Sequence, residues 1–440
     1  MRIRPGSNLI RAILGLAFLS PLTFVMPQTP WVLFIGMIPV VGMAIRDYRH
    51  IRRSLTAMSI SRRQPAIVGR DVLFLVELEI ANQGDQQIVG VLRDVMPNIA
   101  VPNHQPESIR ISPFEIVTLT VQLRIPERGQ YELGPIWLRL EGPLRLLEGQ
   151  KSFESKSRIK VMPETFVAKD GLSEDPRAQL LMLDRITRAR QSGAGTEFES
   201  LAEYRQGDDP RRIDWRTTAR LGYPIIRRYQ VERHRDVMMV VDCGRLMGTS
   251  TEKGSKLDCA VDSTLMLAEV ALRHGDRCGF SFFDDQVRGY RTPLSGISSV
   301  HTLADSIYNL QTRWRESDFG AMFAELQLRQ ARRSLIVLIS DIVDVETTTR
   351  FRTSLARLAK RHVLLFAALR TPMLKRVIHS TVSSQLDASR KAVAFTLLQQ
   401  RQKALHSLRH SGIHILDIEP SELTVPLINE FIDLRSQNLL

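Results

Sequence analysis

Two long apolar runs near the N-terminus constrain the fold of this chain more than any other feature. Residues 9–26 (LIRAILGLAFLSPLTFVM) contain one charged residue, Arg11, and residues 31–45 (WVLFIGMIPVVGMAI) contain none. Only residues 27–30 (PQTP) separate the two runs. Because a helix needs about 20 mostly apolar residues to span a bilayer, the pattern predicts a transmembrane helical hairpin over residues 1–53. The alternative is a buried hairpin of a soluble domain.

The charges around these runs predict their orientation. Arginines precede the first run and follow the second, whereas the connecting turn is uncharged. The flanking arginines are Arg2, Arg4 and Arg11 on one side and Arg46, Arg49, Arg52 and Arg53 on the other. Since basic flanks stay on the cytoplasmic side, we expect a multi-pass protein of the inner (cytoplasmic) membrane with its soluble domains in the cytoplasm. The second apolar run argues against a cleaved signal peptide.

A β domain is expected over residues 54–162. Residues 72–80 (VLFLVELEI) and 116–125 (IVTLTVQLRI) alternate apolar and polar side chains, and a turn-forming NQGD follows the first at residues 82–85. Such alternation without a helical period is typical of antiparallel strands. The chain, at 440 residues, is also longer than one hydrophobic core usually serves. We therefore expect a separate all-β sandwich of immunoglobulin-like type, with no catalytic constellation in it.

Residues 236–440 alternate apolar strand-length runs with helical stretches. The expected strands are 236–242, 277–283, 334–340 and 362–369, and the expected helices are 255–274, 300–310, 320–333 and 345–361. This alternation predicts an α/β domain of Rossmann-like type with a mostly parallel sheet. Ligands bind beyond the carboxyl ends of such strands, and two of these ends carry aspartates, Asp242 and Asp341. The absence of GxGxxG and GxxxxGK[ST] disfavours nucleotide binding of the Rossmann or P-loop type.

A linker and a dense polar segment are expected between these domains, over residues 163–235. A helix is predicted over residues 176–190, and the polar run follows at residues 203–220 (EYRQGDDPRRIDWRTTAR). In that run Gly207 permits a tight turn, and Asp208 or Asp209 caps a helix that begins at Pro210. We expect Asp214 and Trp215 to lie within this helix. The segment is then a brace against the α/β domain, with Trp215 as its apolar anchor.

The order of these motifs resembles the bacterial von Willebrand factor A-like proteins that carry domain of unknown function fifty-eight. The most specific match is residues 203–215 (EYRQGDDPRRIDW), continued at residues 219–220, 231–233 and 240–242. The resemblance covers nearly the whole chain, including the paired apolar runs and the β-rich middle. It implies a von Willebrand factor A-like C-terminal domain. It also implies a MoxR-type AAA+ ATPase as partner, in protein complex maturation or envelope stress.

The resemblance also implies a place to look for a metal. In A-type domains an Asp-x-Ser-x-Ser run, a Thr and a second Asp hold a divalent cation above the sheet, and such oxygen donors suit Mg²⁺. Here the first run is DCGRL at residues 242–246, so Gly244 and Leu246 replace the two hydroxyl donors. Asp242, Ser317 and Asp341 remain, and we expect weak Mg²⁺ binding at most. The alternative is that both carboxylates are bonded by backbone amides and nearby arginines.

The expected function is that of a membrane-anchored, non-catalytic protein-binding module. The net charge of +13 is compatible with a nucleic-acid partner, a membrane surface or an arginine-rich solvated exterior, and composition does not choose among them. Acidic residues interrupt the arginine-rich segment, which suits protein docking better than a phosphate track. Arg211 and Arg212 are the expected partner-binding residues. The three cysteines, Cys243, Cys259 and Cys278, have no metal-site spacing and are expected in the core. Two alternatives stay open: a membrane-associated nucleic-acid-binding protein, and a metal-dependent hydrolase that uses Asp242 and Asp341.

Overall fold

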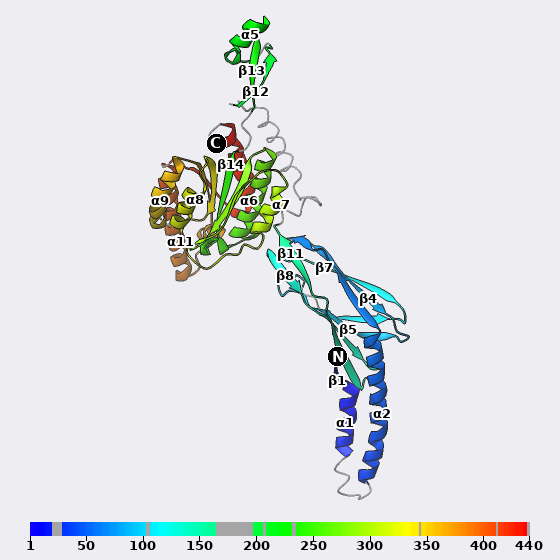
Figure 1. The fold of residues 1–440 in the computed structure, drawn as a ribbon. Coiled ribbons are helices and arrows are strands. Elements are labelled where there is room, and N and C mark those ends of the chain that lie inside the picture. The colour runs from blue at the N-terminus through cyan, green and yellow to red at the C-terminus, as the bar shows by residue number, and fades with distance from the viewer. Residues whose placement is uncertain are drawn as a thin grey trace. The chain divides into compact units, whose positions relative to one another are not determined.

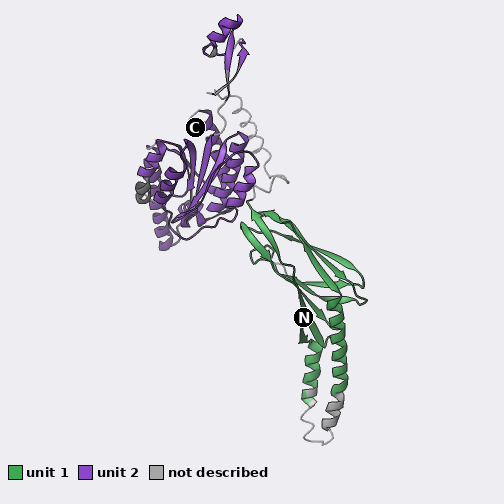
Figure 2. Ribbon diagram, viewed as in Figure 1, with its two compact units in different colours: residues 1–162 green, residues 163–440 purple. Residues whose placement is uncertain are grey.

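The computed structural model describes residues 1–19, 29–102, 106–163, 197–205, 208–230, 235–342, 345–410 and 412–437. The chain divides into two compact units, Met1–Met162 and Pro163–Leu440 (Figures 1 and 2). The helix expected over residues 176–190 lies outside the described residues, as does Gly207.

The first unit is a β-rich domain with one hydrophobic core. Its three sheets have the strand orders β1-β10-β9-β5-β6, β2-β4-β7 and β3-β11-β8, and every described pair is antiparallel except β3 with β11. The strands are β1 (Arg2–Pro5), β2 (Met58–Arg63), β3 (Ile67–Gly69), β4 (Phe74–Asn82), β5 (Ile88–Asp94), β6 (Glu107–Ile111), β7 (Ile116–Leu123), β8 (Gly129–Leu133), β9 (Ile136–Glu141), β10 (Leu147–Phe153) and β11 (Ser157–Met162).

Alternation along the strands builds this core. In β4 the side chains of Val76, Leu78 and Ile80 are buried, whereas Glu77 between them is exposed, because successive residues of a strand point to opposite faces. The same apolar set joins residues from the other strands in a single cluster. The expectation of a β-rich domain is therefore confirmed.

Two helices at the N-terminus belong to this β domain rather than to a domain of their own. Helices α1 (Ser7–Leu19) and α2 (Thr29–Thr56) follow strand β1, which pairs with β10. The last turns of α2 bring Ile51 and Leu55 into the core of the β domain. Residues 1–53 therefore do not form a separate unit, because their two ends take part in the sheet and in its core.

Among the described residues, no helix combines the length and the apolar content that crossing a membrane requires. The predicted transmembrane hairpin is thus not supported by the described helices. Residues 20–28, which complete the first apolar run and the turn, lie outside the described part of the chain.

The second unit contains a six-stranded sheet of order β18-β17-β14-β19-β20-β21. Its strands are β14 (Asp236–Asp242), β17 (Arg277–Phe283), β18 (Val287–Leu294), β19 (Ser334–Ser340), β20 (Val363–Leu369) and β21 (His414–Ile418). All neighbours are parallel except β17 with β18. Every residue of β14 and β19 is buried, as expected for central strands covered on both faces. The predicted, mostly parallel α/β sheet is present.

Helices cover both faces of this sheet (Figure 1). The helices are α6 (Lys256–Arg273), α7 (Ser299–Ile307), α8 (Phe319–Arg329), α9 (Val345–Ala359), α10 (Pro372–His379), α11 (Gln385–Arg409) and α12 (Thr424–Ser436). Helices α6 and α7 lie on one face, and α8 and α9 lie on the other. The first strand of this sheet, β14, lies in its middle. The next two strands, β17 and β18, are added on one side of β14, and β19, β20 and β21 are added on the other side. The point between β14 and β19 is therefore the topological switch point, where such folds bind ligands.

The polar segment forms a small hairpin with helices in its loop. Strand β12 (Glu197–Glu203) pairs antiparallel with β13 (Ile225–Gln230), and the 3₁₀ helix η3 (Pro210–Arg212) and helix α5 (Trp215–Leu221) lie between them. The prediction that Asp209 caps a helix beginning at Pro210 is confirmed by η3, but the prediction that Asp214 and Trp215 lie within that same helix is wrong. Asp214 has extended backbone angles and accepts hydrogen bonds from the amides of Arg216 and Thr217, so it caps a new helix rather than continuing the first one.

Candidate functional site

Two buried aspartates mark the carboxyl edge of the sheet, as predicted. Asp242 is the last residue of β14, and Asp341 follows the last residue of its parallel neighbour β19. Parallel neighbours bring their carboxyl ends to the same edge. The side chains of both residues are nevertheless buried, so these carboxylates are not open to solvent.

Three donors from this chain surround the carboxylate of Asp242. Its Oδ1 accepts hydrogen bonds from the Gly244 amide at 2.8 Å and from the Ser317 hydroxyl at 2.5 Å, and its Oδ2 accepts one from Ser340 at 2.5 Å. Burial raises the pKa of Asp242, and these hydrogen bonds oppose the rise. The site therefore holds the carboxylate with neutral donors.

Gly244 makes room for the approach of Ser317. A Cβ atom at position 244 would lie 2.1 Å from the Ser317 hydroxyl oxygen. A serine here, as in the metal-binding pattern of A-type domains, would therefore push Ser317 away from Asp242. The two departures from that pattern, glycine at position 244 and the direct bond between Ser317 and Asp242, are thus structurally linked.

A lysine that the sequence analysis missed neutralises the second aspartate. Lys256 is 0% exposed, and its ammonium donates to Asp341 Oδ2 at 2.5 Å and to the Thr371 hydroxyl at 2.7 Å. Lys256 is the first residue of α6, whose start is set by a capping box between Ser255 and Asp258. Burial lowers the pKa of Lys256, and the negative charge of Asp341 opposes that effect.

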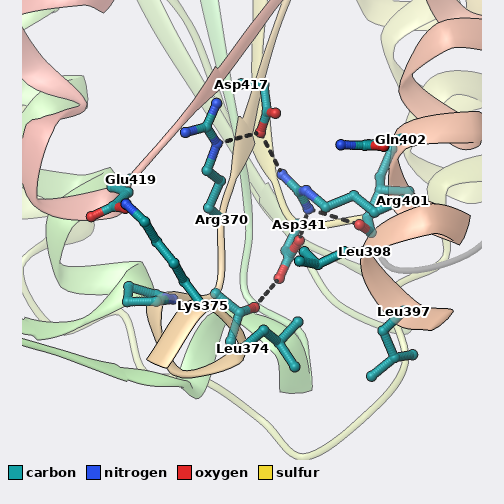
Figure 3. A pocket seen from close by; sticks show the side chains of 13 residues that line it. Asp341, Arg370, Leu374, Lys375, Leu397, Leu398, Arg401, Gln402, Asp417 and Glu419 are labelled. Atoms are coloured by element: carbon teal, nitrogen blue, oxygen red, sulfur yellow. Dashed lines mark hydrogen bonds and ion pairs between the residues drawn. The ribbon is translucent and has the colours of Figure 1, made fainter. Parts of the chain in front are cut away.

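An arginine from α11 neutralises the same carboxylate from the other side (Figure 3). Arg401 donates through Nη1 to Asp341 Oδ1 and to the Ile342 carbonyl, the latter at 2.7 Å. Its Nη2 donates to Asp417 at 3.1 Å, and Asp417 also pairs with Arg370 at 3.2 Å. Asp341 thus lies between two buried cations.

These residues do not fit a tightly bound magnesium ion. Both oxygens of Asp341 are bonded to cationic side chains, Lys256 and Arg401, which repel a further cation. Asp242 and Ser317 are bonded to each other. Among the described residues, no group of three or more His, Cys, Asp or Glu side chains is placed to hold a metal ion. The alternative interpretation, carboxylates bonded by amides and cations, describes the geometry that is present.

A cavity of about 330 Å³ opens beside Asp341 (Figure 3). Residues at the ends of β19, β20 and β21 line it, together with residues of α10 and α11. Helix α11 and strand β21 were not among the elements predicted from the sequence. The cavity is therefore lined in part by two elements in which the sequence analysis proposed no site residue.

An exposed tryptophan lies on a loop attached to the same edge. Trp314 is 85% exposed. Backbone hydrogen bonds hold its two neighbours: the Arg313 amide donates to the Cys243 carbonyl at 3.0 Å, and the Arg245 amide donates to the Arg315 carbonyl at 2.8 Å. The loop is thus attached to the segment that follows β14, and it presents a large aromatic side chain to solvent.

The residues proposed in the polar segment bond mainly to one another. Asp208 accepts from the Arg205 amide at 2.9 Å, and Asp214 accepts from Arg227 at 2.9 Å. The hydrogen bond from Arg227 lowers the pKa of Asp214, with smaller help from the backbone amides that it caps. These contacts organise the segment itself, and its role as a brace for the α/β domain stays a prediction.

Trp215 does not act as the expected apolar anchor. Its side chain is 70% exposed. Trp215 is the first residue of the short helix α5, and no residue of this helix is buried. Arg211, in η3, is also exposed, and its backbone amide donates to Asp209. The side chain of Arg212 is outside the described part of the structure. Of the two predicted partner-binding arginines, only Arg211 therefore has a described side chain, and it is exposed.

The three cysteines, Cys243, Cys259 and Cys278, are buried thiols that form no disulfide with one another, as predicted for small core residues. Burial raises the pKa of Cys278 well above its ordinary value, with further increases from the charges of Asp276 and Asp236. A thiol in this state is a poor nucleophile.

Comparison with known proteins gives relatives for part of the chain. An uncharacterized protein of Mycobacterium bovis is 26% identical over 175 residues, which are 39% of this chain and 54% of that protein. A Mycobacterium tuberculosis protein gives the same values. This chain therefore spans about half the length of the curated relatives it matches.

Solved structures show only distant likeness. An aerotolerance-related membrane protein from Bacteroides fragilis is 13% identical, with 45% of this chain and 98% of that chain covered and a TM-score of 0.28. A CARDB domain from Pyrococcus furiosus is 14% identical, with 24% and 94% covered and a TM-score of 0.18.

A family model matches most of the polar segment and a large part of the α/β domain. The model described as "Protein of unknown function DUF58" matches residues 200–381, from the β12 hairpin through β14 and β19 to α10. Over these residues, which are less than half of the chain, the protein is similar to the DUF58 family.

Proposed function

We propose that this protein is a membrane-associated, non-catalytic binding module whose α/β domain presents the carboxyl edge of its sheet to a partner protein. The observation that carries the proposal is Trp314, which is 85% exposed on a loop that is held by backbone hydrogen bonds. Exposed tryptophans on ordered loops are typical of the residues that contribute most to protein interfaces. A rigid loop also loses little conformational freedom on binding.

The geometry of the aspartates supports binding rather than hydrolysis. A metal-dependent hydrolase would need Asp242 and Asp341 free to hold a metal or activate water. Both carboxylates instead have internal donors on each oxygen. The hydrolase alternative would require these bonds to break before each reaction.

The partner that we propose is a MoxR-type AAA+ ATPase. This choice depends on the resemblance of residues 203–215 to proteins that carry domain of unknown function fifty-eight, because that resemblance implies such a partner. On the same ground we propose that the α/β domain is von Willebrand factor A-like. The nucleic-acid alternative receives less support, because Arg227 pairs with Asp214 and Arg315 pairs with Asp285. Arginines engaged in this way are less available to phosphates.

We expect Trp314→Ala to reduce partner recovery at least tenfold, the effect of removing a central aromatic contact. The measurement is affinity purification of the full chain from detergent-solubilised membranes, with mass spectrometry of the bound proteins. An AAA+ ATPase should be recovered with the wild type. The melting temperature should stay nearly unchanged, because substitutions of exposed side chains have small effects on stability.

Leu328→Ala is the matched control for this experiment. Leu328 is also a large apolar residue, 81% exposed, but it lies near the end of α8. Its replacement should leave recovery unchanged. Equal recovery with Trp314→Ala and the wild type would contradict the proposal. Recovery that disappears on nuclease treatment would favour the nucleic-acid alternative instead.

We also propose that the helical pair anchors the protein in the inner membrane with both ends in the cytoplasm. Large apolar side chains on α1 and α2 are exposed, among them Ile13, Leu14, Phe18 and Ile38, and Phe18 is 86% exposed. Exposed apolar surface of this kind suits lipid or another apolar partner. The arginines on both flanks, with the uncharged turn, support the orientation.

A reporter fused after the C-terminus should behave as cytoplasmic, since the basic flanks hold both ends inside. The measurement is fluorescence of green fluorescent protein, which requires the cytoplasm, together with activity of alkaline phosphatase, which requires the periplasm. A fusion after Gln28, in the turn, is the control and should give the opposite pattern. Digestion of residues after Arg53 by protease added outside sealed spheroplasts would show that the orientation is wrong.

A further inference from the structure

The cavity beside Asp341 has two walls of different chemistry (Figure 3). Leu374 from α10 and Leu397 and Leu398 from α11 contribute apolar surface. Arg370 and Arg401 contribute the guanidinium groups of the other wall. A cavity of about 330 Å³ with one apolar and one cationic wall suits a small group that is itself partly apolar and partly charged.

Three carboxylates and three cations line this cavity, and Lys256, which is buried behind the lining and bonded to Asp341, adds a fourth cation. The carboxylates are those of Asp341, Asp417 and Glu419. Four cations bond to them: Lys256 and Arg401 to Asp341, Arg401 and Arg370 to Asp417, and Lys375 to Glu419. One positive charge is thus left without a counter-charge within the group, which favours an anionic ligand.

Arg401 has a buried hydrogen-bond donor that is not used within the described structure. Its side chain is only 8% exposed, and its Nη1 and Nη2 bond to Asp341 and Asp417. Its Nε, however, is buried with no acceptor among the described residues. Buried donors of this kind are rare in native proteins and call for an acceptor beyond the described residues, which a ligand in the adjacent cavity would supply.

We propose that this cavity binds a carboxylate carried on a short aliphatic group, as found at the C-terminus of a peptide that ends in leucine or valine. The carboxylate accepts hydrogen bonds on the cationic wall, where guanidinium groups match its planar geometry. The aliphatic side chain lies against Leu374, Leu397 and Leu398. The proposal rests on the proposed binding function and adds to it the chemistry of the end that is recognised.

A fluorescein-labelled pentapeptide that ends in leucine tests the proposal, with fluorescence anisotropy on the purified full chain in detergent. The peptide with a free C-terminal carboxylate should bind at least tenfold more tightly than the same peptide with a C-terminal amide. N-acetyl-leucine, added as a competitor, separates the two sources of this chemistry. If N-acetyl-leucine displaces the labelled peptide at the same concentration as the unlabelled peptide does, a free aliphatic acid is sufficient for binding. If N-acetyl-leucine competes much more weakly, the cavity recognises the end of a peptide.

Leu398→Glu should weaken binding of the free-carboxylate peptide at least tenfold, because it places a negative charge in the apolar wall. Gln399→Glu is the matched control: it adds the same charge at the next residue of α11, which is exposed and does not line the cavity. If Leu398→Glu lowers the melting temperature strongly, Leu374→Glu makes the same test from α10.

Three results would overturn the proposal: equal affinity for the carboxylate and amide peptides, unchanged affinity in the cavity variants, or no binding of the free-carboxylate peptide at millimolar concentration. The proposed function can be judged separately. If Leu398→Glu binds the free-carboxylate peptide as tightly as the wild type while Trp314→Ala loses the ATPase, the binding function stands and the cavity proposal fails.

Discussion

Replacing Lys256 with methionine is expected to destabilise the α/β domain by about 3–5 kcal/mol, the range for removing one partner of a buried ion pair. Methionine keeps the apolar stem but removes the ammonium that bonds to Asp341 and Thr371. Asp341 is buried and would keep Arg401 as its cationic partner. The loss should appear in urea unfolding of the full chain followed by circular dichroism.

Hydrogen exchange places this loss within the domain. The amides of β14 and β19 should exchange faster in Lys256→Met, because β19 ends directly before Asp341 and β14 is its hydrogen-bonded neighbour in the sheet. Lys253→Met is the matched control, since Lys253 is an exposed lysine three residues earlier in the chain, and it should change stability by less than about 0.5 kcal/mol. A loss below about 1 kcal/mol for Lys256→Met would mean that the ion pair contributes little beyond what methionine packing replaces.

Replacing Asp47 with alanine is expected to destabilise the β domain by about 3 kcal/mol, because buried amides would lose their acceptor. Asp47 lies in α2 and is fully buried. Its carboxylate accepts hydrogen bonds from the amides of Leu144 at 3.1 Å, Leu146 at 2.8 Å and Leu147 at 3.4 Å. These bonds attach α2 to the segment that leads into β10.

Hydrogen exchange of residues 144–147 in the full chain measures this effect directly. Their amides should lose protection in Asp47→Ala and keep part of it in Asp47→Asn, which retains one oxygen acceptor. Glu132→Ala is the control, because Glu132 forms an exposed ion pair with Arg158 at 3.0 Å and such pairs contribute about 0–1 kcal/mol. If the two alanine variants lose equal stability, Asp47 does not hold the helix to the β domain.

The short-range pattern predicted much of the α/β domain. Residues 277–283 and 334–340 were expected as strands and are β17 and β19, because uninterrupted apolar runs of this length suit the centre of a parallel sheet. The helix expected over residues 255–274 is α6, whose boundaries follow from a local capping box. Helix α11 and strand β21 were not predicted, because they lie in a region where exposed and buried residues give a weaker period.

The two tryptophans show where local reasoning failed. Trp215 was predicted as an anchor because an aromatic residue in a polar run usually packs against something. It is exposed at the start of a short helix, whereas Trp314, which no motif had indicated, is exposed beside the sheet edge. Whether a tryptophan is buried depends on which elements surround it, and that information is absent from its sequence neighbours.

The sequence by itself determined that Asp242 and Asp341 lie at the carboxyl ends of buried strands, because strand period is a property of short segments. Only the tertiary structure decided that these two strands are neighbours and what the carboxylates bind. Lys256 reaches Asp341 across 85 residues of sequence, and Arg401 reaches it across 60. Asp47 likewise meets its amides about a hundred residues later, at Leu147. A buried charge must find a partner wherever the fold brings one close, and that distance in space leaves no local pattern in the chain.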